Sequence, residues 1–432
     1  MPAVLTLGAV LELTMAANPD MQAAAARARI AEETLARARA EFFPTLGFNE
    51  SFRISNSPLQ RFSFLESENQ LKPSDFFSGQ TTADDFHSQV HFQQDLYNGG
   101  ARLARHRSAE ADREASRLDV AAVQNRIVFQ VAEAYYRLYQ ARELGKVRRE
   151  AVAQVESELR AAEARLRAQT AVRSDVLQIE VRLAEVREAL IAVGHQEELA
   201  WAVLENVTGV RLAGHELPES LPAAPWSESS EAVEAAVAAA IESRPELDAA
   251  KLRQQSAQEL VRAARAGNQP TLSAVADYDV FTSDFRSGAD SFFVGVALGL
   301  KLFDGGRTRA GIRQAEARVA EIVAGNRRLQ LDIELDVRRA YLQLKDARER
   351  LNVVTAAVSS ARESLRQIES QYQNQSATVT QVIDAQVALS AARVRAANAH
   401  AEIEIARAAL ERAIGRLTLF LTPPESACPA HG

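Results

Sequence analysis

The sequence predicts an α+β fold made of two structural repeats, each combining a β-hairpin with a long helical hairpin. Three observations support this fold class. Short motifs recur at constant offsets along the chain. Segments of alternating apolar and polar residues precede two Gly-Gly pairs, as is typical of half-buried strands. Two stretches of roughly 70 residues contain no proline, which long helices require.

The repeat appears as two offsets. Pro19 and Pro44 correspond to Pro245 and Pro270, which lie 226 residues later. Beyond the predicted strands the offset is 206 residues, and the matching motifs are Asn98-Gly99-Gly100 with Asp304-Gly305-Gly306, Ala134-Tyr135 with Ala340-Tyr341, and Thr208-Gly209 with Ile414-Gly415. The offset therefore drops once, by 20 residues, between residues 46 and 98. Both halves share one architecture, and the first half has the longer loop between its strands.

The predicted elements follow the same order in both repeats. Residues 1–210 form the first repeat, 211–230 a linker, 231–416 the second repeat and 417–432 a C-terminal tail. In the first repeat we expect helices over 9–17 and 20–41. They are followed by a β-hairpin about 45–97, with strands over 46–54 and 86–97 and a polar loop near 57–85. A helical hairpin about 100–208, which turns at 170–174, completes the repeat. In the second repeat we expect helices over 231–242 and 245–266. They are followed by a β-hairpin about 271–303, with strands over 272–280 and 292–302 and a turn at 283–290. A helical hairpin about 306–415, which turns at 376–380, completes the repeat.

Proline and glycine mark the ends of these elements. Proline cannot continue the helical hydrogen-bond ladder, so it is predicted to break or end helices. The predicted helix breaks are Pro19, Pro44, Pro245 and Pro270. A glycine lets the chain swing from strand to helix because it has no Cβ. The predicted strand-to-helix corners are Gly99, Gly100, Gly305 and Gly306.

The strand before the first Gly-Gly pair has two different faces. Phe86, Val90 and Phe92 share one face, whereas His87 and His91 lie on the other among glutamines and an aspartate. In the second repeat the apolar face is unbroken and consists of Phe292, Val294, Val296, Leu298, Leu300 and Leu302. Strands of about 10–12 residues can cross a bilayer core when tilted. His87 and His91 could suggest a metal site, but a wet face needs polar residues in any case and no third ligand lies nearby in sequence.

Two hairpins supply four strands per chain, which is too few to close a barrel. An open strand edge in lipid leaves backbone groups without hydrogen-bond partners. Two interpretations follow from the residues. Either several chains pool their strands in one closed barrel, which makes oligomerisation obligatory, or the strands form a small soluble sheet covered by helices.

Composition and charge exclude several classes of protein. The formal net charge of −7 provides no basic excess for phosphates, so we expect no nucleic acid partner. A single cysteine, Cys428, excludes an intrachain disulfide framework. The sequence contains no apolar stretch long enough to predict a transmembrane helix. Residues 1–4 do not have the pattern of a signal peptide, so we expect that the signal of an exported protein has been removed. No constellation for catalysis, cofactor or metal binding is found, which predicts a protein that is not an enzyme.

Nearly the whole chain, roughly residues 6–416, resembles the TolC-like outer-membrane efflux proteins, also called outer membrane factors. The resemblance lies in the proline positions above, in the two motifs 96–100 and 302–306 that end in Gly-Gly, and in the tips 174–177 and 380–384 of the helical hairpins. It implies a homotrimer in which four strands from each chain form a 12-stranded outer-membrane β-barrel. That barrel is continuous with a long periplasmic α-helical barrel.

The resemblance also implies a function. It is that of a passive exit duct of a tripartite efflux pump or a type I secretion system, opened at its periplasmic tip when an adaptor protein and an inner-membrane pump engage it. The implied location is the outer membrane, in contact with its lipid, with a large periplasmic extension. The alternatives are a soluble periplasmic coiled-coil scaffold, which should show sustained heptads, and an adaptor, which should have one helical hairpin followed by β-rich domains. The exported substrate and the particular pump stay open.

A gate at the helical tips is implied by the same resemblance. Tyr372 corresponds to the family's latching tyrosine, Asp384 to a pore aspartate and Asp175 to the aspartate of the neighbouring tip. Two positions depart from the family's pattern. Ala377 stands in place of the latching arginine, and Gln381 in place of a second ring aspartate. The departures put the latch in doubt and weaken the acidic constriction.

The tip residues also have simpler interpretations. Arg173 is a candidate partner for a tip carboxylate in place of the missing arginine. Ser174 and Thr380 are candidate helix caps, and acids in the first turns of helices, as expected for Asp175 and Asp384, stabilise the helix dipole at any exposed site. Both the gating and the capping interpretations stay open for these residues.

Overall fold

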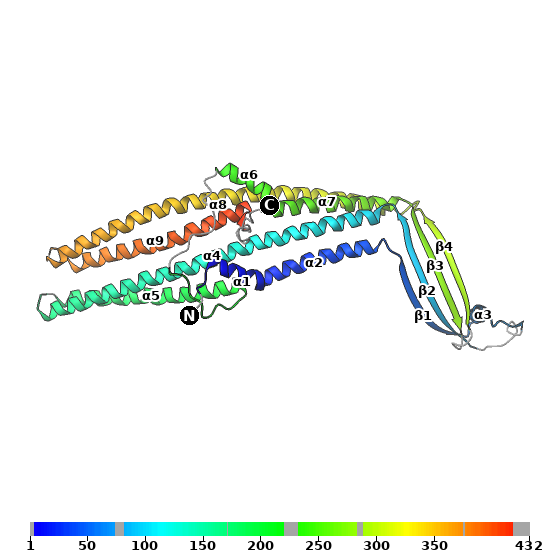
Figure 1. Cartoon of the computed structure of the whole chain (residues 1–432), viewed down its shortest axis with the longest axis horizontal. Coiled ribbons are helices and arrows are strands. Elements are labelled where there is room, and N and C mark those ends of the chain that lie inside the picture. The colour runs from blue at the N-terminus through cyan, green and yellow to red at the C-terminus, as the bar shows by residue number, and fades with distance from the viewer. Residues whose placement is uncertain are drawn as a thin grey trace, which may run out of the picture. The chain divides into compact units, whose positions relative to one another are not determined.

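The computed structural model of the chain describes residues 4–73, 82–170, 172–219, 232–282, 288–374 and 376–417. The protein is mostly helical with one small antiparallel sheet, as predicted (Figure 1). It divides into two compact units. Unit 1 consists of Met1–Arg27, Arg117–Asp248 and Asn326–Gly432, and unit 2 of Ala28–Ser116 and Ala249–Gly325. Each unit draws residues from both sequence repeats, so the repeats are not the spatial units of the fold.

Unit 2 contains the four-stranded sheet. Its strands are β1 (Thr45–Ser55), β2 (Ala83–Asn98), β3 (Thr271–Thr282) and β4 (Gly288–Gly299), which lie side by side in chain order (Figure 1). All three pairings are antiparallel, and β2 and β3 join the two repeats. Among the described strands, β1 and β4 form the two open edges of this sheet.

Three strand predictions need correction. The segment expected as a polar loop over 57–85 contains a helix, α3 (Pro58–Ser67), with Pro58 in its first turn and Phe64 buried. It also contains the start of β2, at Ala83. Strand β4 ends at Gly299, so the predicted extension to residue 302 is wrong. Gly299 is paired with Thr271, the first residue of β3, and the preceding proline has no N–H to extend the ladder. Strand β4 begins at Gly288, so residues 288–290 are strand and not turn as predicted, and the rest of the predicted 283–290 turn lies outside the described residues.

The corners between strand and helix use the Gly-Gly pairs. Helices α4 (Ala101–Arg167) and α8 (Arg307–Gln373) follow these pairs, and all four glycines have positive φ angles between 65° and 84°. At Gly99 an added Cβ would lie 2.5 Å from the Gln269 Cβ. Asp304 begins the second corner and accepts hydrogen bonds from the Gly306 and Thr308 backbone N–H groups at 3.0 and 2.9 Å. These hydrogen bonds, with one from the Thr308 hydroxyl, lower the pKa of Asp304.

The helices that lead into the strands stop before the predicted prolines. Helix α2 (Pro19–Ala40) ends four residues before Pro44, and β1 begins directly after that proline. Helix α7 (Pro245–Arg265) continues into a short 3-10 turn at Ala266–Asn268, and β3 begins directly after Pro270. The other two prolines are the first residues of α2 and α7, where the missing N–H has no helical partner to lose.

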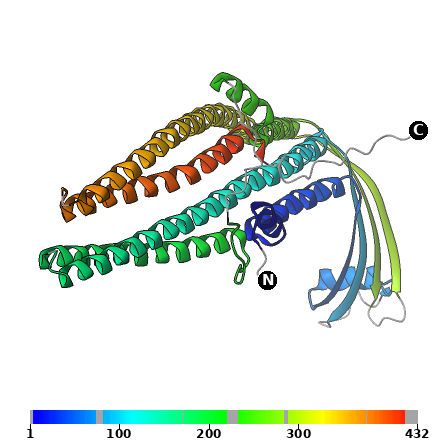
Figure 2. The ribbon, with the colours of Figure 1, turned by 60° about the vertical axis from the view of Figure 1, so that its left-hand side comes forward.

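Unit 1 contains most of two helical hairpins of matching length, whose first helices begin in unit 2. Helix α4 is followed by α5 (Arg173–Thr208), and α8 by α9 (Val379–Ile414). The first helices of the hairpins have 67 residues each and the second helices 36 each. Figure 2 shows the two partners of each hairpin side by side. No helix of the described ranges is both long enough and apolar enough to span a membrane.

Apolar residues at helical spacing hold unit 1 together. One buried cluster joins α4 and α5 with α1 (Leu7–Ala17), and another joins α8 and α9 with α6 (Val233–Ser243). Tyr135 and Tyr136 are almost fully buried in the first of these clusters, and burial raises the pKa of Tyr135 to about 12. Near the hairpin tips, smaller clusters centre on Leu183 and Leu389. These clusters form within one chain, whereas large apolar side chains such as Ile191, Leu342 and Val353 stay exposed on the same helices.

Candidate functional site: a two-faced sheet and the tips of two helical hairpins

One face of the sheet is apolar and exposed. The register brings together residues of the same kind from all four strands, for example Leu46 with Phe92 and Leu272 with Leu298. Phe292 is 79% exposed and Leu298 74%. The other large exposed residues of this face are Phe48, Phe52, Ile54, Val90, Tyr278, Val294 and Val296. A contiguous apolar surface of this kind marks contact with a membrane or a partner, because water is a poor solvent for it.

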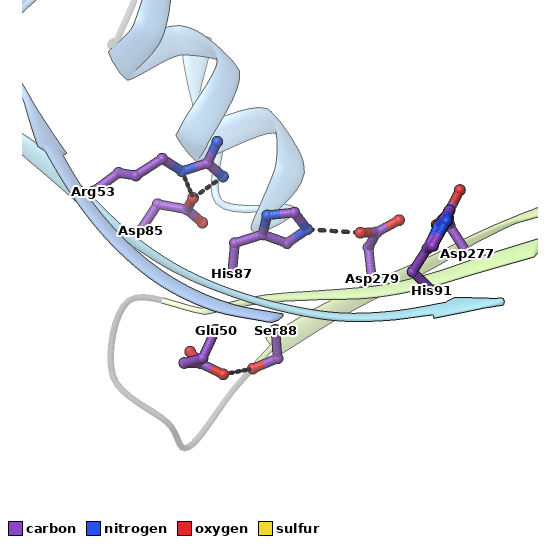
Figure 3. Close-up of polar contacts among 8 residues, drawn as sticks. All are labelled: Glu50, Arg53, Asp85, His87, Ser88, His91, Asp277 and Asp279. Carbon is purple, nitrogen blue, oxygen red and sulfur yellow. Dashed lines mark hydrogen bonds and ion pairs between the residues drawn. The ribbon is translucent and has the colours of Figure 1, made fainter. Parts of the chain in front are cut away.

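The opposite face, here called the polar face, carries a row of paired charged side chains (Figure 3). Arg53 on β1 donates from Nε to the Asp85 carboxylate on β2 at 3.0 Å, and Asp85 is fully buried. His87 Nε2 lies 2.6 Å from the Asp279 Oδ1. Figure 3 shows these residues on one side of the sheet and the Ser88–Glu50 hydrogen bond on the other.

A second histidine pair continues this row. His91 lies opposite Asp277 in the β2–β3 register, with 2.5 Å between His91 Nδ1 and Asp277 Oδ1. Phe281 stacks on the ring of His87 at 4.5 Å, so the face also carries aromatic surface. Helix α3 packs on this side, because Arg53 lies over its buried Phe64 ring at 5.3 Å. No group of three or more possible metal ligands occurs within the described ranges.

The tip of α9 differs from the prediction. Thr378, not Thr380, is the N-cap, and it forms a capping box with Gln381. The Gln381 backbone N–H donates to the Thr378 hydroxyl at 3.3 Å, and the Thr378 N–H donates to Gln381 Oε1 at 2.8 Å. The Gln381 side chain is therefore used to start the helix. Asp384 is exposed and lies beyond the first turn, so the expected position in that turn is wrong.

At the tip of α5 the predicted cap is also absent. Val172 is the N-cap residue, without a side-chain hydrogen bond, and Ser174 lies within the helix. Asp175 is in the first turn, as expected, where its charge favours the helix dipole. Arg173 is exposed, and no ion pair joins it to a tip carboxylate in the part of the chain that is described.

Tyr372 lies between the two hairpins and contacts a different arginine. It packs against the apolar clusters of both tips. The Arg165 guanidinium, on α4, lies over its ring at 5.0 Å. Both residues line a cavity of about 210 Å³, together with Glu158 and Glu369. A cation over an aromatic ring is attracted by the ring quadrupole, so this contact holds α4 against α8.

Polar contacts join α4 to α9 above the tips. The Gln386 Nε2 donates to Glu158 Oε1, and Gln386 is only 7% exposed. The Gln386 Oε1 has no partner among the described residues. Burial is the main cause that raises the pKa of Glu158, and Glu369 adds to it, whereas hydrogen bonds from Gln386 and Gln154 oppose the rise. Further along, Arg393 and Glu150 form an ion pair at 3.2 Å.

Sequence reasoning did not find Arg165, Glu158 or Gln386. Each lies in a helix where arginine, glutamate and glutamine are common surface residues. Arg165 and Tyr372 are also 207 positions apart, so no local pattern links them. Only the packing of the two hairpins brings them together.

The sequence and the fold were compared with known proteins. The family described as "Outer membrane efflux protein" matches residues 10–210 and 236–416. The outer membrane efflux protein BepC of Brucella suis biovar 1 is 25% identical over 414 residues, which cover 93% of this chain and 83% of that protein. The pyoverdine export outer membrane protein OpmQ of Pseudomonas aeruginosa is also 25% identical, over 95% of this chain and 83% of that protein.

The fold is similar to that of solved outer-membrane proteins. The structure of the outer membrane protein VceC from Vibrio cholerae superposes with a TM-score of 0.79 at 22% sequence identity. The aligned part covers 95% of this chain and 96% of that one. At this identity the likeness concerns the fold alone.

Proposed function

Since the chain belongs to the outer membrane efflux protein family, we propose that three copies of it form a passive exit duct through the outer membrane for an efflux pump or a type I secretion system. In this proposal the pooled strands span the lipid, and the helical hairpins extend into the periplasm. An adaptor protein and an inner-membrane pump engage the tips of the hairpins and supply the energy for export.

The two-faced sheet with open edges is the observation that carries this proposal. Its apolar face needs a lipid environment, because burying each large apolar side chain contributes about 1.5–3 kcal/mol. Its polar face needs water. The edges of β1 and β4 need strand partners, since an unpaired backbone group in lipid costs several kcal/mol. Only a closed barrel with a wet interior meets all three needs.

The number of copies follows from the interior of the barrel. Two copies would supply eight strands, and a barrel of that size is filled by its own side chains. Three copies would supply twelve strands, which leaves room for water beside the paired side chains of the polar face. A duct for export therefore favours the trimer over the dimer.

The contacts between the hairpins support a gate at the tips. The Arg165–Tyr372 contact and the Glu158–Gln386 hydrogen bond join one hairpin to the other within a single chain. Separating the hairpins breaks these contacts and removes Val379 of α9 from the cluster around Leu183, whereas the cluster around Leu389 lies entirely within the second hairpin. Of the residues expected at the gate, Tyr372 takes part in such a contact. Asp384, Asp175 and Arg173 stay proposals as pore-facing groups, whereas the capping role of Gln381 argues against a pore role.

The mass of the detergent-solubilised protein tests the proposal. The full chain would be purified in a mild detergent, and its mass measured by light scattering with the detergent contribution subtracted. We expect three times the chain mass of 47.2 kDa, and loss of this species when the detergent is removed. A mass of two chains would contradict the twelve-stranded barrel. A soluble monomer in plain buffer would contradict the membrane assignment and favour the scaffold alternative.

A further inference from the structure

The boundary between the two repeats in the sheet carries two histidine–aspartate pairs. His91 and Asp277 are direct cross-strand neighbours, and His87 reaches Asp279 diagonally, with ring-to-carboxylate distances of 2.5 and 2.6 Å. In both pairs the histidine comes from β2 and the aspartate from β3. Figure 3 shows both pairs on the same side as Arg53, the side opposite to Glu50.

The charge of this row depends on the protonation of the imidazoles. Histidine changes its charge between about pH 5 and pH 8 in most environments. With neutral imidazoles the two pairs carry two negative charges per chain, and with protonated imidazoles they carry none. The Arg53–Asp85 ion pair on the same face is neutral in both conditions.

The surroundings of the pairs add few other charges. Next to them in the sheet register lie Gly47, Asn49 and Ser51 on β1, Gln89 and Gln93 on β2, Val275 and Phe281 on β3, and Ser291 and Phe293 on β4, all uncharged. Towards the α4 end, β2 also carries Asp95. At the other end α3 carries Arg61 and Glu66, and Glu68 is its C-cap residue. The charge near the middle of the polar face is therefore set by the two pairs.

We propose that His87, Asp279, His91 and Asp277 form a charge-selective band inside the barrel that favours cations at neutral pH and loses this preference in acid. The inference rests on the proposed function, because it requires the polar face to line a water-filled pore. With two carboxylates from each of three chains, the band carries six negative charges when its imidazoles are neutral. Low-dielectric walls strengthen such a field and raise the local concentration of cations, as acidic rings do in cation channels.

The test is ion selectivity in planar lipid bilayers. The full-length protein is inserted, a potassium chloride gradient is applied, and the reversal potential is measured at pH 7.5 and pH 5. The wild-type channel should prefer cations at pH 7.5, and its cation-to-anion permeability ratio should fall at least about twofold at pH 5. The Asp277→Asn/Asp279→Asn variant should already have a low ratio at pH 7.5, and a ratio below that of the wild type at pH 5, where protonated imidazoles have no carboxylate to compensate them. Asparagine keeps a hydrogen-bond acceptor for each histidine.

Two further variants separate the roles of the four residues. His87→Gln/His91→Gln should keep the cation preference at both pH values, because its carboxylates stay uncompensated. The matched control is Glu50→Gln, which removes one carboxylate per chain from the opposite face of the same sheet and should leave the ratio unchanged. A conducting channel whose ratio is unaffected by the double aspartate variant would overturn the inference alone. Inserted protein that never conducts, even when Arg165→Gln removes the contact at the hairpin tips, would overturn the proposed function and this inference with it.

Discussion

Asn18 donates a hydrogen bond from its side-chain Nδ2 to the backbone carbonyl oxygen of Val207 at 2.7 Å. Its Oδ1 accepts from the N–H groups of Asp20 and Met21, so one side chain caps α2 and ties it to the end of α5. The second repeat has an equivalent contact, from Arg244 Nε to the Ala413 carbonyl oxygen at 2.8 Å. In both repeats the residue before the proline binds the carbonyl two residues before a helix-ending glycine.

Loss of the Asn18 side chain should therefore destabilise unit 1. Asn18→Ala removes a helix cap and leaves the part-buried Val207 carbonyl without this donor, which should cost about 1–3 kcal/mol. The measurement is thermal unfolding of the purified protein in detergent. Gln22→Ala is a suitable control, because it removes an exposed amide with a marginal 3.5 Å contact from the same helix. Equal melting temperatures for the two variants would contradict the capping role.

The two corners should respond differently to alanine. Gly99 and Gly305 hold equivalent positions with φ angles of +68° and +65°, so alanine costs about 1–2 kcal/mol at either from backbone strain. At Gly99 the new Cβ would also meet the Gln269 Cβ at 2.5 Å, whereas it would meet nothing within 4 Å at Gly305. Gly99→Ala should thus lower the yield of the detergent-stable oligomer far more than Gly305→Ala. Equal yields for the two variants would contradict this prediction, because they would show that the contact between the new Cβ at position 99 and Gln269 is relieved without cost.

The contact between α4 and α9 should strengthen in acid. The folded protein raises the pKa of Glu158 above the ordinary 4.5, so the folded state holds its proton more tightly than the unfolded state. The resulting stabilisation is complete below pH 4.5 and is lost as the pH rises through the raised value. A protonated Glu158 can also donate to the unpartnered Oε1 of Gln386 and form a second hydrogen bond.

Spin labels at Arg160 and Ala388 can report this effect, with the labelled chain diluted in unlabelled chain so that distances arise within one chain. Both positions would be changed to cysteine in a Cys428→Ser background. The distance distribution should narrow from pH 7.5 to pH 5. Glu158→Gln should remove the pH response, because a neutral amide pair keeps both hydrogen bonds at every pH. Glu163→Gln, on the same helix, is the control, and an unchanged response in Glu158→Gln would refute the assignment.

The Arg165–Tyr372 contact should hold the tip closed. A partly exposed cation–π contact contributes about 0.5–1 kcal/mol, so Arg165→Gln should raise the ratio of open to closed channel about two- to fivefold. Single-channel recording in planar bilayers measures this ratio. Arg173→Gln removes an exposed arginine at the neighbouring tip and should have little effect. A larger effect from Arg173→Gln would restore the interpretation of Arg173 as the latching partner.

The sequence was most informative where periodicity and repetition act together. The offsets of 226 and 206 residues identified equivalent positions such as Asn18 and Arg244. Their shared role in binding a helix-end carbonyl was not predicted, because the sequence does not show which acceptor each side chain reaches. Helix α3 was missed because a ten-residue helix in a polar segment has little apolar periodicity, and its stability depends on Phe64 reaching Arg53. The Arg165–Tyr372 contact was missed because it depends on the packing of two hairpins. The capping box at Thr378 was also missed, although its threonine and glutamine stand three residues apart in the sequence and form a recognisable motif.

The open edges of β1 and β4 also bear on how the protein is made. Unit 1 forms buried apolar clusters within one chain, so this packing does not need sister chains. The sheet cannot reach its final state alone, and a single chain in water presents Phe292 and Leu298 beside an unpaired strand edge. Such an edge recruits any extended segment, which is the usual route to aggregation. In the proposed barrel, insertion with sister chains competes with off-pathway strand addition, and the supply of unassembled chain to the membrane should set the yield.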